Sequence, residues 1–140
     1  MEREKAVVFD VDGTLALRTG DRSPYDWHRV GEDEPNEAIV ELLRIVARDG
    51  EHRIVVTSGR KEQCRRQTDV WFALHDIPID AMFMRADHDN RPDYVVKEEM
   101  YRRHVEPRYD VAFVVDDRTQ VVQAWRRMGL TCLQVAEGNF

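Results

Sequence analysis

The chain has 140 residues, of which 42% are hydrophobic and 34% charged, and its net charge is −6. This length and composition predict one globular domain over residues 1–140, and the acidity argues against adhesion to nucleic acid or membrane through overall charge. No apolar run approaches the roughly 20 residues of a membrane span, and the mostly charged residues 1–5 do not resemble a signal peptide. The two cysteines, Cys64 and Cys132, lack metal-ligand spacing, which predicts reduced thiols and a cytoplasmic location.

Short apolar stretches alternate with amphipathic segments along the chain. Buried strands are predicted over residues 7–9, 53–57, 80–84, 111–115 and 131–135. Helices are predicted between Pro35 and Gly50, over residues 61–75 and 93–104, and from Arg118 to Met128. The polar residues 15–34, broken by glycine and proline, predict a flap or hairpin. This order predicts an α/β fold: a single doubly wound, Rossmann-like parallel sheet of about five strands, with a minimal flap and no large cap.

Two carboxylates separated by one residue follow the first predicted strand. Asp10 and Asp12 therefore lie at the carboxyl end of a strand, the edge at which open α/β sheets bind ligands. Carboxylates so close repel each other, and a bound Mg²⁺ is the usual remedy. Asp10 is a candidate nucleophile for an aspartyl-phosphate intermediate, and Asp12 a candidate general acid and base. The alternative is an ordinary Asp-Gly loop after a strand.

Three further features fall at or beside the carboxyl ends of predicted strands. Ser58, with the backbone amides that follow it, can hold phosphate oxygens, and Lys97 can offset the charge of nucleophile and phosphate. Asp116 or Asp117 can complete a Mg²⁺ shell with Asp10 and the backbone carbonyl of Asp12. Each feature alone has another explanation, because Ser58 or the Asp116 and Asp117 pair can cap a helix and Lys97 can be solvated. Their joint order favours phosphoryl chemistry.

The joint order of these motifs resembles the haloacid dehalogenase superfamily of Mg²⁺-dependent phosphatases. A closer similarity is to the 3'-phosphatase domain of phage-type polynucleotide kinase-phosphatases, carried by residues 22–26, 56–60, 93–99 and 116–122. This resemblance implies that Asp10 is the nucleophile and Asp12 the general acid and base. It also implies that Arg22 and Arg60 contact the substrate phosphate or the transition state, and that Asp93 is an auxiliary site residue.

The same resemblance implies a substrate and a partner. The substrate would be 3'-phosphorylated DNA or RNA ends, and the partner a polynucleotide kinase domain outside this chain, because no Gly-rich kinase loop is present here. An open site without a large cap admits a polymer end, and Tyr25 or Trp27 can stack on a terminal base. Eight cations are candidates to follow its phosphates: Arg18, Arg22, Arg29, Lys61, Arg65, Arg66, Arg85 and Arg91. The alternatives are a phosphatase of nucleotides or small phosphometabolites and a catalytically silent domain that binds phosphorylated ends.

Overall fold

The structure is a computed structural model, and it describes residues 2–20, 23 and 25–140. The predicted phosphate contact Arg22 and the side chain of Trp27 lie outside this described part. No helix among the described residues is long and apolar enough to cross a membrane. Cys64 and Cys132 are buried free thiols, as the sequence predicts.

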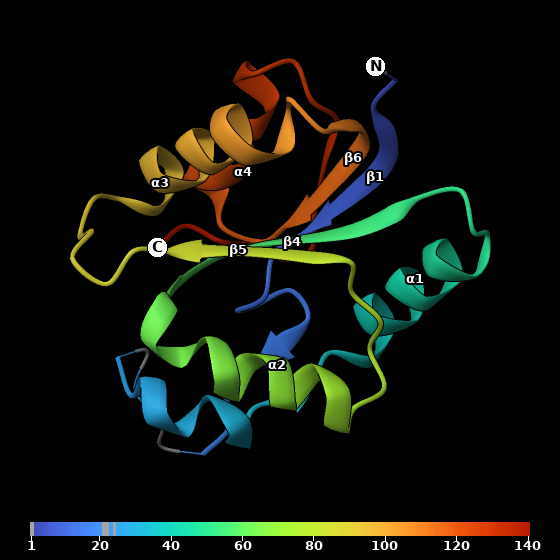
Figure 1. Ribbon diagram of the computed structural model, residues 1–140. Helices are drawn as coiled ribbons and strands as arrows, with labels where there is room; N and C mark the ends of the chain where they lie inside the picture. Colours follow the sequence, from blue (N-terminus) through green and yellow to red (C-terminus); the bar gives the residue numbers. More distant parts are fainter. Residues whose placement is uncertain (1, 21–22, 24) are drawn as a thin grey trace.

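A five-stranded parallel sheet forms the centre of the molecule, as Figure 1 shows. Its order in space is β5-β4-β1-β6-β7. The bounds are Glu4–Phe9 for β1, Arg53–Lys61 for β4, Ala81–Arg85 for β5, Tyr109–Asp116 for β6 and Cys132–Gln134 for β7. The sheet confirms the predicted α/β fold and all five predicted strands. Because β1 is the middle strand, its carboxyl end lies where the ends of β4 and β6 flank it.

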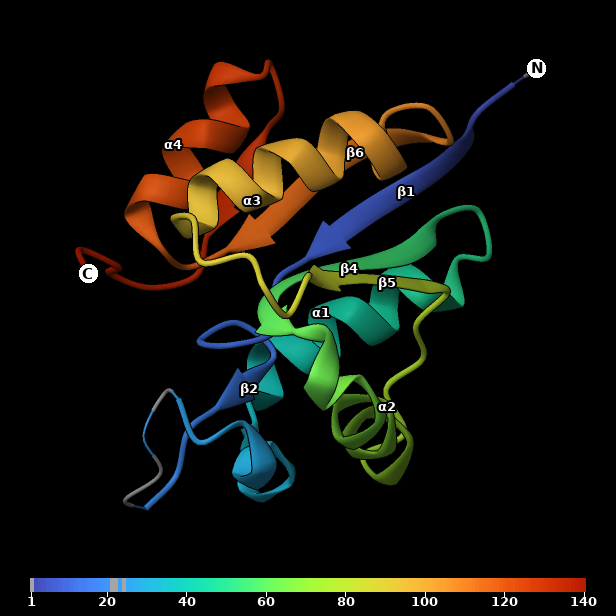
Figure 2. The same ribbon diagram turned by 60° about the vertical axis from the view of Figure 1, so that its left-hand side comes forward.

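Helices cover both faces of this sheet, as the two views in Figures 1 and 2 show. The helices α1 (Glu37–Arg48) and α2 (Arg65–Leu74) lie on one face. The other face carries α3 (Asp93–Met100), its continuation as the short π-helix η3 (Tyr101–Val105), and α4 (Thr119–Arg127). Alternate residues of β1 therefore enter two separate cores: Val7 and Phe9 pack toward α1 and α2, while Ala6 and Val8 pack toward α4.

A small flap follows the first strand. Its strands β2 (Ala16–Leu17) and β3 (Glu34–Pro35) pair antiparallel, and the 3-10 helix η1 (Trp27–Glu32) lies between them. This arrangement confirms the flap predicted for residues 15–34. No larger cap is found among the residues that the structure describes.

The predicted helix over residues 61–75 differs from the structure in its start and in its buried side. Strand β4 continues through Lys61, and a short 3-10 turn, η2 (Glu62–Cys64), precedes α2. The spacing places Gln67, Val70, Trp71 and Leu74 on one side, but Val70 is 49% exposed and Leu74 is 73% exposed. The buried side instead carries Thr68, Trp71 and Phe72. On this buried side the Trp71 indole N–H donates to the carbonyl of Asp33 on the flap, 2.8 Å away, and the Thr68 hydroxyl accepts from Arg60.

Candidate active site

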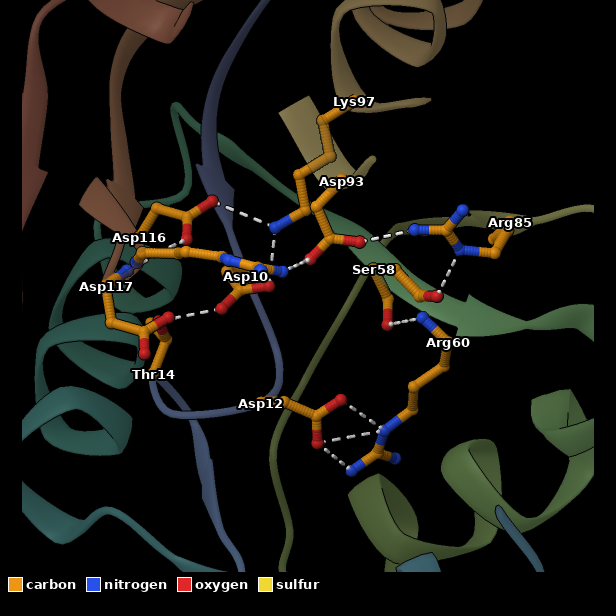
Figure 3. Close-up of polar contacts among 12 residues, drawn as sticks. Asp10, Asp12, Thr14, Ser58, Arg60, Arg85, Asp93, Lys97, Asp116 and Asp117 are labelled. Carbon is orange, nitrogen blue, oxygen red and sulfur yellow. Dashed lines mark hydrogen bonds and ion pairs between the residues drawn. The ribbon is translucent and has the colours of Figure 1, made fainter. Parts of the chain in front are cut away.

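The predicted site residues converge on a cavity of about 840 Å³ at the carboxyl ends of β1, β4 and β6. Its position agrees with the rule that open α/β sheets bind ligands at this edge. The lining includes six of the nine predicted site residues: Asp10, Asp12, Asp93, Lys97, Asp116 and Asp117. Figure 3 shows Asp10, Lys97 and Asp116 pointing toward one another, while Asp12 points toward Arg60. Ser58 and Arg60 are only 1% exposed and do not line the cavity.

Four charged side chains form what we call the floor of the cavity: Asp10, Lys97, Asp116 and Asp117. Asp10 is 5% exposed, and the Lys97 ammonium lies 2.6 Å from its Oδ1 and 2.9 Å from Oδ2 of Asp116. The second oxygen of Asp10 accepts a hydrogen bond of 3.0 Å from the Thr14 hydroxyl. The Trp125 indole N–H donates to Asp116 over 3.1 Å, which holds this carboxylate from the core side. Asp10 is therefore fixed in position at the end of β1 (Figure 3).

The floor carboxylates are close enough to share a metal ion. One oxygen each from Asp10, Asp116 and Asp117 lies within 4.8 Å of the others. Burial raises the pKa of Asp10 well above its usual value, and the charge of Asp116 raises it further against the opposing effect of Lys97. Burial also raises the pKa of Asp117. Three crowded carboxylates beside a single lysine fit a hard divalent cation with oxygen ligands, such as Mg²⁺.

A glycine makes room for this cluster. Gly13 has a positive φ of 81°, and a Cβ there would lie 2.1 Å from Oδ2 of Asp117. A larger residue would therefore clash with the carboxylate as well as strain the backbone. The Gly in the Asp-Val-Asp-Gly-Thr motif thus lets the chain leave β1 without displacing Asp117.

The second carboxylate of the motif has a different environment. The Asp12 side chain is 45% exposed and lies on the guanidinium of Arg60, with contacts of 2.7 Å from Nη2 and 3.0 Å from Nε. The Arg60 side chain is fully buried, and it also pairs with the buried Asp33 at 3.0 Å and donates to the Thr68 hydroxyl. Arg60 thus lies behind Asp12 and holds its carboxylate, and the contact with the substrate phosphate or the transition state stays a prediction (Figure 3).

Asp93 joins three segments at one wall of the cavity. Its carboxylate pairs with Arg85 at 2.5 Å and with Arg118 at 3.2 Å, and Arg85 also donates to the carbonyl of Gly59 over 2.8 Å. Burial alone would raise the pKa of Asp93, but Lys97, Arg85 and Arg118 together lower it. A Cβ on Gly59 would lie 2.4 Å from Oδ1 of Asp93, so this close approach requires glycine.

Ser58 stabilises the backbone turn instead of facing the cavity. Its hydroxyl accepts a hydrogen bond of 3.0 Å from the backbone N–H of Arg60.

The structure adds residues to which the sequence assigned no site role: Thr14, Asp33, Arg118 and Trp125. Thr14 and Arg118 lie in the same motifs as the predicted aspartates, and this position in the sequence could have identified them as site residues. Asp33 and Trp125 carry no such signal, because only the folded chain brings them to Arg60 and Asp116.

Asp10 and Asp12 follow the central strand, and Lys97 on α3 bonds both to Asp10 and to Asp116 at the end of the neighbouring strand β6. This combination defines a phosphatase domain of the haloacid dehalogenase superfamily. The model of the family described as "Polynucleotide kinase PNKP phosphatase domain" matches residues 4–140. The chain belongs to this family. The match confirms the family resemblance that the sequence motifs predict.

Known proteins support the same assignment. A protein of Autographa californica nuclear polyhedrosis virus, described as a bifunctional polynucleotide kinase/RNA ligase, is 36% identical over 124 residues, which are 87% of this chain and 18% of the viral protein. A chain in the solved structure of a Pnkp1/Rnl/Hen1 complex is 35% identical with a TM-score of 0.93, and the match covers 99% of this chain and 48% of that one. The chain thus spans less than half of the length of these relatives.

The fold extends to more distant phosphatases. The class C acid phosphatase from Bacillus anthracis, solved with tungstate bound, has a TM-score of 0.71 at 16% identity, covering 100% of this chain and 69% of that chain. At this identity the likeness shows the shared fold alone.

Proposed function

We propose that this domain removes phosphate from the 3' ends of DNA or RNA, by way of an aspartyl-phosphate on Asp10. The observation that carries the proposal is the position of Asp10: one oxygen is held by Lys97 and the other by Thr14, on the floor of a cavity of about 840 Å³. A small flap instead of a large cap leaves room for a polymer end. Membership of a polynucleotide kinase phosphatase family supports the same substrate.

In the first half of the reaction, a carboxylate oxygen of Asp10 attacks the phosphorus atom. The bond between phosphorus and the 3'-oxygen breaks, and Asp12 donates its proton to that leaving oxygen. The ammonium of Lys97, 2.6 Å from Asp10, offsets the negative charge that gathers as the phosphate approaches the carboxylate. Arg60 acts as a positioning residue, because its guanidinium holds the Asp12 carboxyl from behind.

In the second half, water attacks the phosphorus atom of the aspartyl-phosphate. Asp12, now deprotonated, accepts the proton of this water, and the bond between phosphorus and the Asp10 oxygen breaks. Inorganic phosphate leaves and Asp10 returns as a carboxylate. Asp93, fixed between Arg85 and Arg118, keeps these two cations on the cavity wall, where they can hold the oxygens of the phosphate.

Mg²⁺ is the proposed cofactor, and Asp10, Asp116 and Asp117 would hold it through oxygen atoms. The backbone carbonyl of Asp12 would be a further ligand, as predicted from the sequence, and the Asp12 side chain lies on Arg60. When bound, Mg²⁺ neutralises charge on the transferring phosphate. Zn²⁺ fits less well, because no cysteine or histidine accompanies these carboxylates in the described metal cluster.

We further propose that the domain works beside a polynucleotide kinase in the cytoplasm. The relatives named above are a kinase/ligase and a member of a repair complex, and this chain spans less than half of each. A kinase would supply a 5'-phosphate while this domain exposes a 3'-hydroxyl.

The test is phosphate release from one short oligonucleotide carrying the phosphate at the 3' end or at the 5' end, as DNA and as RNA, with Mg²⁺ or with excess chelator. We expect release from the 3' end only, and only with Mg²⁺. Release from a 3'-mononucleotide or a sugar phosphate at higher catalytic efficiency would favour a small-molecule phosphatase instead. Tight binding of the 3'-phosphorylated end without release would indicate a silent binding domain.

A further inference from the structure

The eight cations considered as contacts for a polynucleotide backbone are not equivalent in the structure. Most of those described are already paired with carboxylates. Arg85 pairs with Asp93 and belongs to the wall of the terminal phosphate site proposed above. On the surface, Arg29 pairs with Asp26 and Glu32, Arg65 with Glu62, and Arg91 with Asp89 and Glu99. A charge so compensated gains little from a second anion in water.

Lys61 and Arg18 differ from these cations, and both line the cavity. The Lys61 ammonium donates to the side-chain oxygen of Asn90 over 2.9 Å, and this neutral amide does not cancel its charge. Neither Lys61 nor Arg18 forms an ion pair with any residue that the structure describes. We call Lys61, Asn90 and Arg18 the rim of the cavity. The rim thus offers uncompensated positive charge beside the floor.

The end of β4 sets the distance between the floor and the rim. Gly59 and Lys61 line the cavity, whereas Ser58 and Arg60 are 1% exposed and lie away from it. Gly59 contacts Asp93, next to the phosphate position proposed above. The register of β4 against β5 shifts between Ser58 and Lys61, and this irregular strand end carries both Gly59, beside the floor, and Lys61, on the rim. The Asn90 contact holds the Lys61 side chain in place, which lowers the entropy cost of binding.

We propose that the rim binds the phosphodiester that precedes the 3'-phosphorylated terminal nucleoside. This inference rests on the proposed function and specifies its substrate. The domain would bind two successive phosphates: the terminal phosphate on the floor, and the bridging phosphate on Lys61 with Arg18 and Asn90 beside it. The site therefore prefers a 3'-phosphorylated dinucleotide to a 3'-mononucleotide. No base contact is needed, so this preference is independent of sequence.

The test measures kcat/KM for a 3'-phosphorylated dinucleotide and for the matching 3'-mononucleotide in wild type and in Lys61→Gln. Lys5→Gln is the matched control, because Lys5 is an exposed lysine and lies outside the cavity lining. We expect the preference for the dinucleotide to fall roughly tenfold in Lys61→Gln and to stay unchanged in the control. The salt dependence of KM for the dinucleotide should also flatten by about one unit of slope in Lys61→Gln.

A dinucleotide with an uncharged methylphosphonate bridge completes a double-mutant cycle. It should lose the same preference in wild type, and Lys61→Gln should then cost nothing more, because both changes remove one interaction. The rim assignment is wrong if the losses of dinucleotide preference caused by Lys61→Gln and by the methylphosphonate add in full. It is also wrong if Lys61→Gln leaves this preference unchanged. If wild type hydrolyses p-nitrophenyl phosphate but no 3'-phosphorylated nucleotide, the proposed function itself is wrong, and the two failures are thereby told apart.

Discussion

The floor and the rim of the cavity differ in how their charges are satisfied. On the floor, Asp10, Lys97 and Asp116 are almost fully buried and bonded to one another at 2.6 and 2.9 Å. On the rim, Arg18 is exposed and Lys61 bonds only to a neutral amide among the described residues. Preorganised buried charges suit the chemical step, and exposed charges suit recognition of a particular substrate. Variants of the floor should therefore change kcat, and variants of the rim should change KM.

The largest expected effect is on the floor. Asp10→Asn keeps the side-chain volume but removes the nucleophile, and it should lower kcat on the order of 10⁴-fold or more. The free energy of unfolding in chelator should stay the same or rise, because one of three crowded carboxylates loses its charge. Steady-state phosphate release and urea denaturation measure the two quantities. Substantial turnover, once deamidation is excluded by mass spectrometry, would contradict the proposed role of Asp10.

Arg60 separates positioning from substrate contact. Arg60→Met removes the buried ion pair between Arg60 and Asp33, which should cost about 3–5 kcal/mol of unfolding free energy and lower kcat through a misplaced Asp12. Asp33→Asn should lower stability in the same direction while the Arg60 pair with Asp12 persists. Urea denaturation and steady-state kinetics measure both variants. A fully stable Arg60→Met with a raised KM alone would support the direct phosphate contact that the sequence suggests.

Metal removal should affect the floor only. With Mg²⁺ at 100 times its dissociation constant, binding should stabilise the folded chain by about 2.7 kcal/mol, seen as a rise in Tm over the chelated sample. Asp117→Asn should lose most of this rise, because it removes one of the three clustered carboxylates. Asp110→Asn is the control, since Asp110 is exposed and outside the cluster. Equal stabilisation of both variants would place the metal elsewhere.

The smallest effect is expected at the cavity mouth. Tyr25 lines the cavity and is 80% exposed, as a stacking platform for a terminal base would be. Tyr25→Ala should weaken oligonucleotide binding by about 1 kcal/mol, whereas Tyr25→Phe should keep it, since stacking needs only the ring. Fluorescence anisotropy with the inactive Asp10→Asn background measures this affinity. Equal loss in both variants would point to the hydroxyl and argue against stacking.

The sequence predicted the floor better than the parts around it. Asp10, Lys97, Asp116 and Asp117 follow strands or lie on a helix whose ends are set by local patterns, and parallel strands bring those ends to one edge. The five strands were predicted for the same reason. The carboxyl ends of these strands could be located from local sequence patterns, without knowledge of long-range contacts.

Arg60 and α2 could not be predicted in this way. The family resemblance implies a phosphate or transition-state contact for Arg60, but its partner Asp33 lies 27 residues away, and only tertiary packing brings them together. The same applies to α2, whose buried Trp71 and Thr68 bond to Asp33 and Arg60, far from them in the sequence or on another element. Long-range polar pairs of this kind leave no periodic signal in a sequence.

The most direct test of the account is to trap the phosphate on the protein. A 3'-phosphorylated oligonucleotide with a radiolabelled terminal phosphate is mixed with the Mg²⁺-loaded chain, and the reaction is stopped with acid within the first turnover. We predict acid-stable label on the protein that maps to the peptide containing Asp10 and is absent from Asp10→Asn. Rapid phosphate release with no label on the protein at any time, or label that persists in Asp10→Asn, would contradict the account.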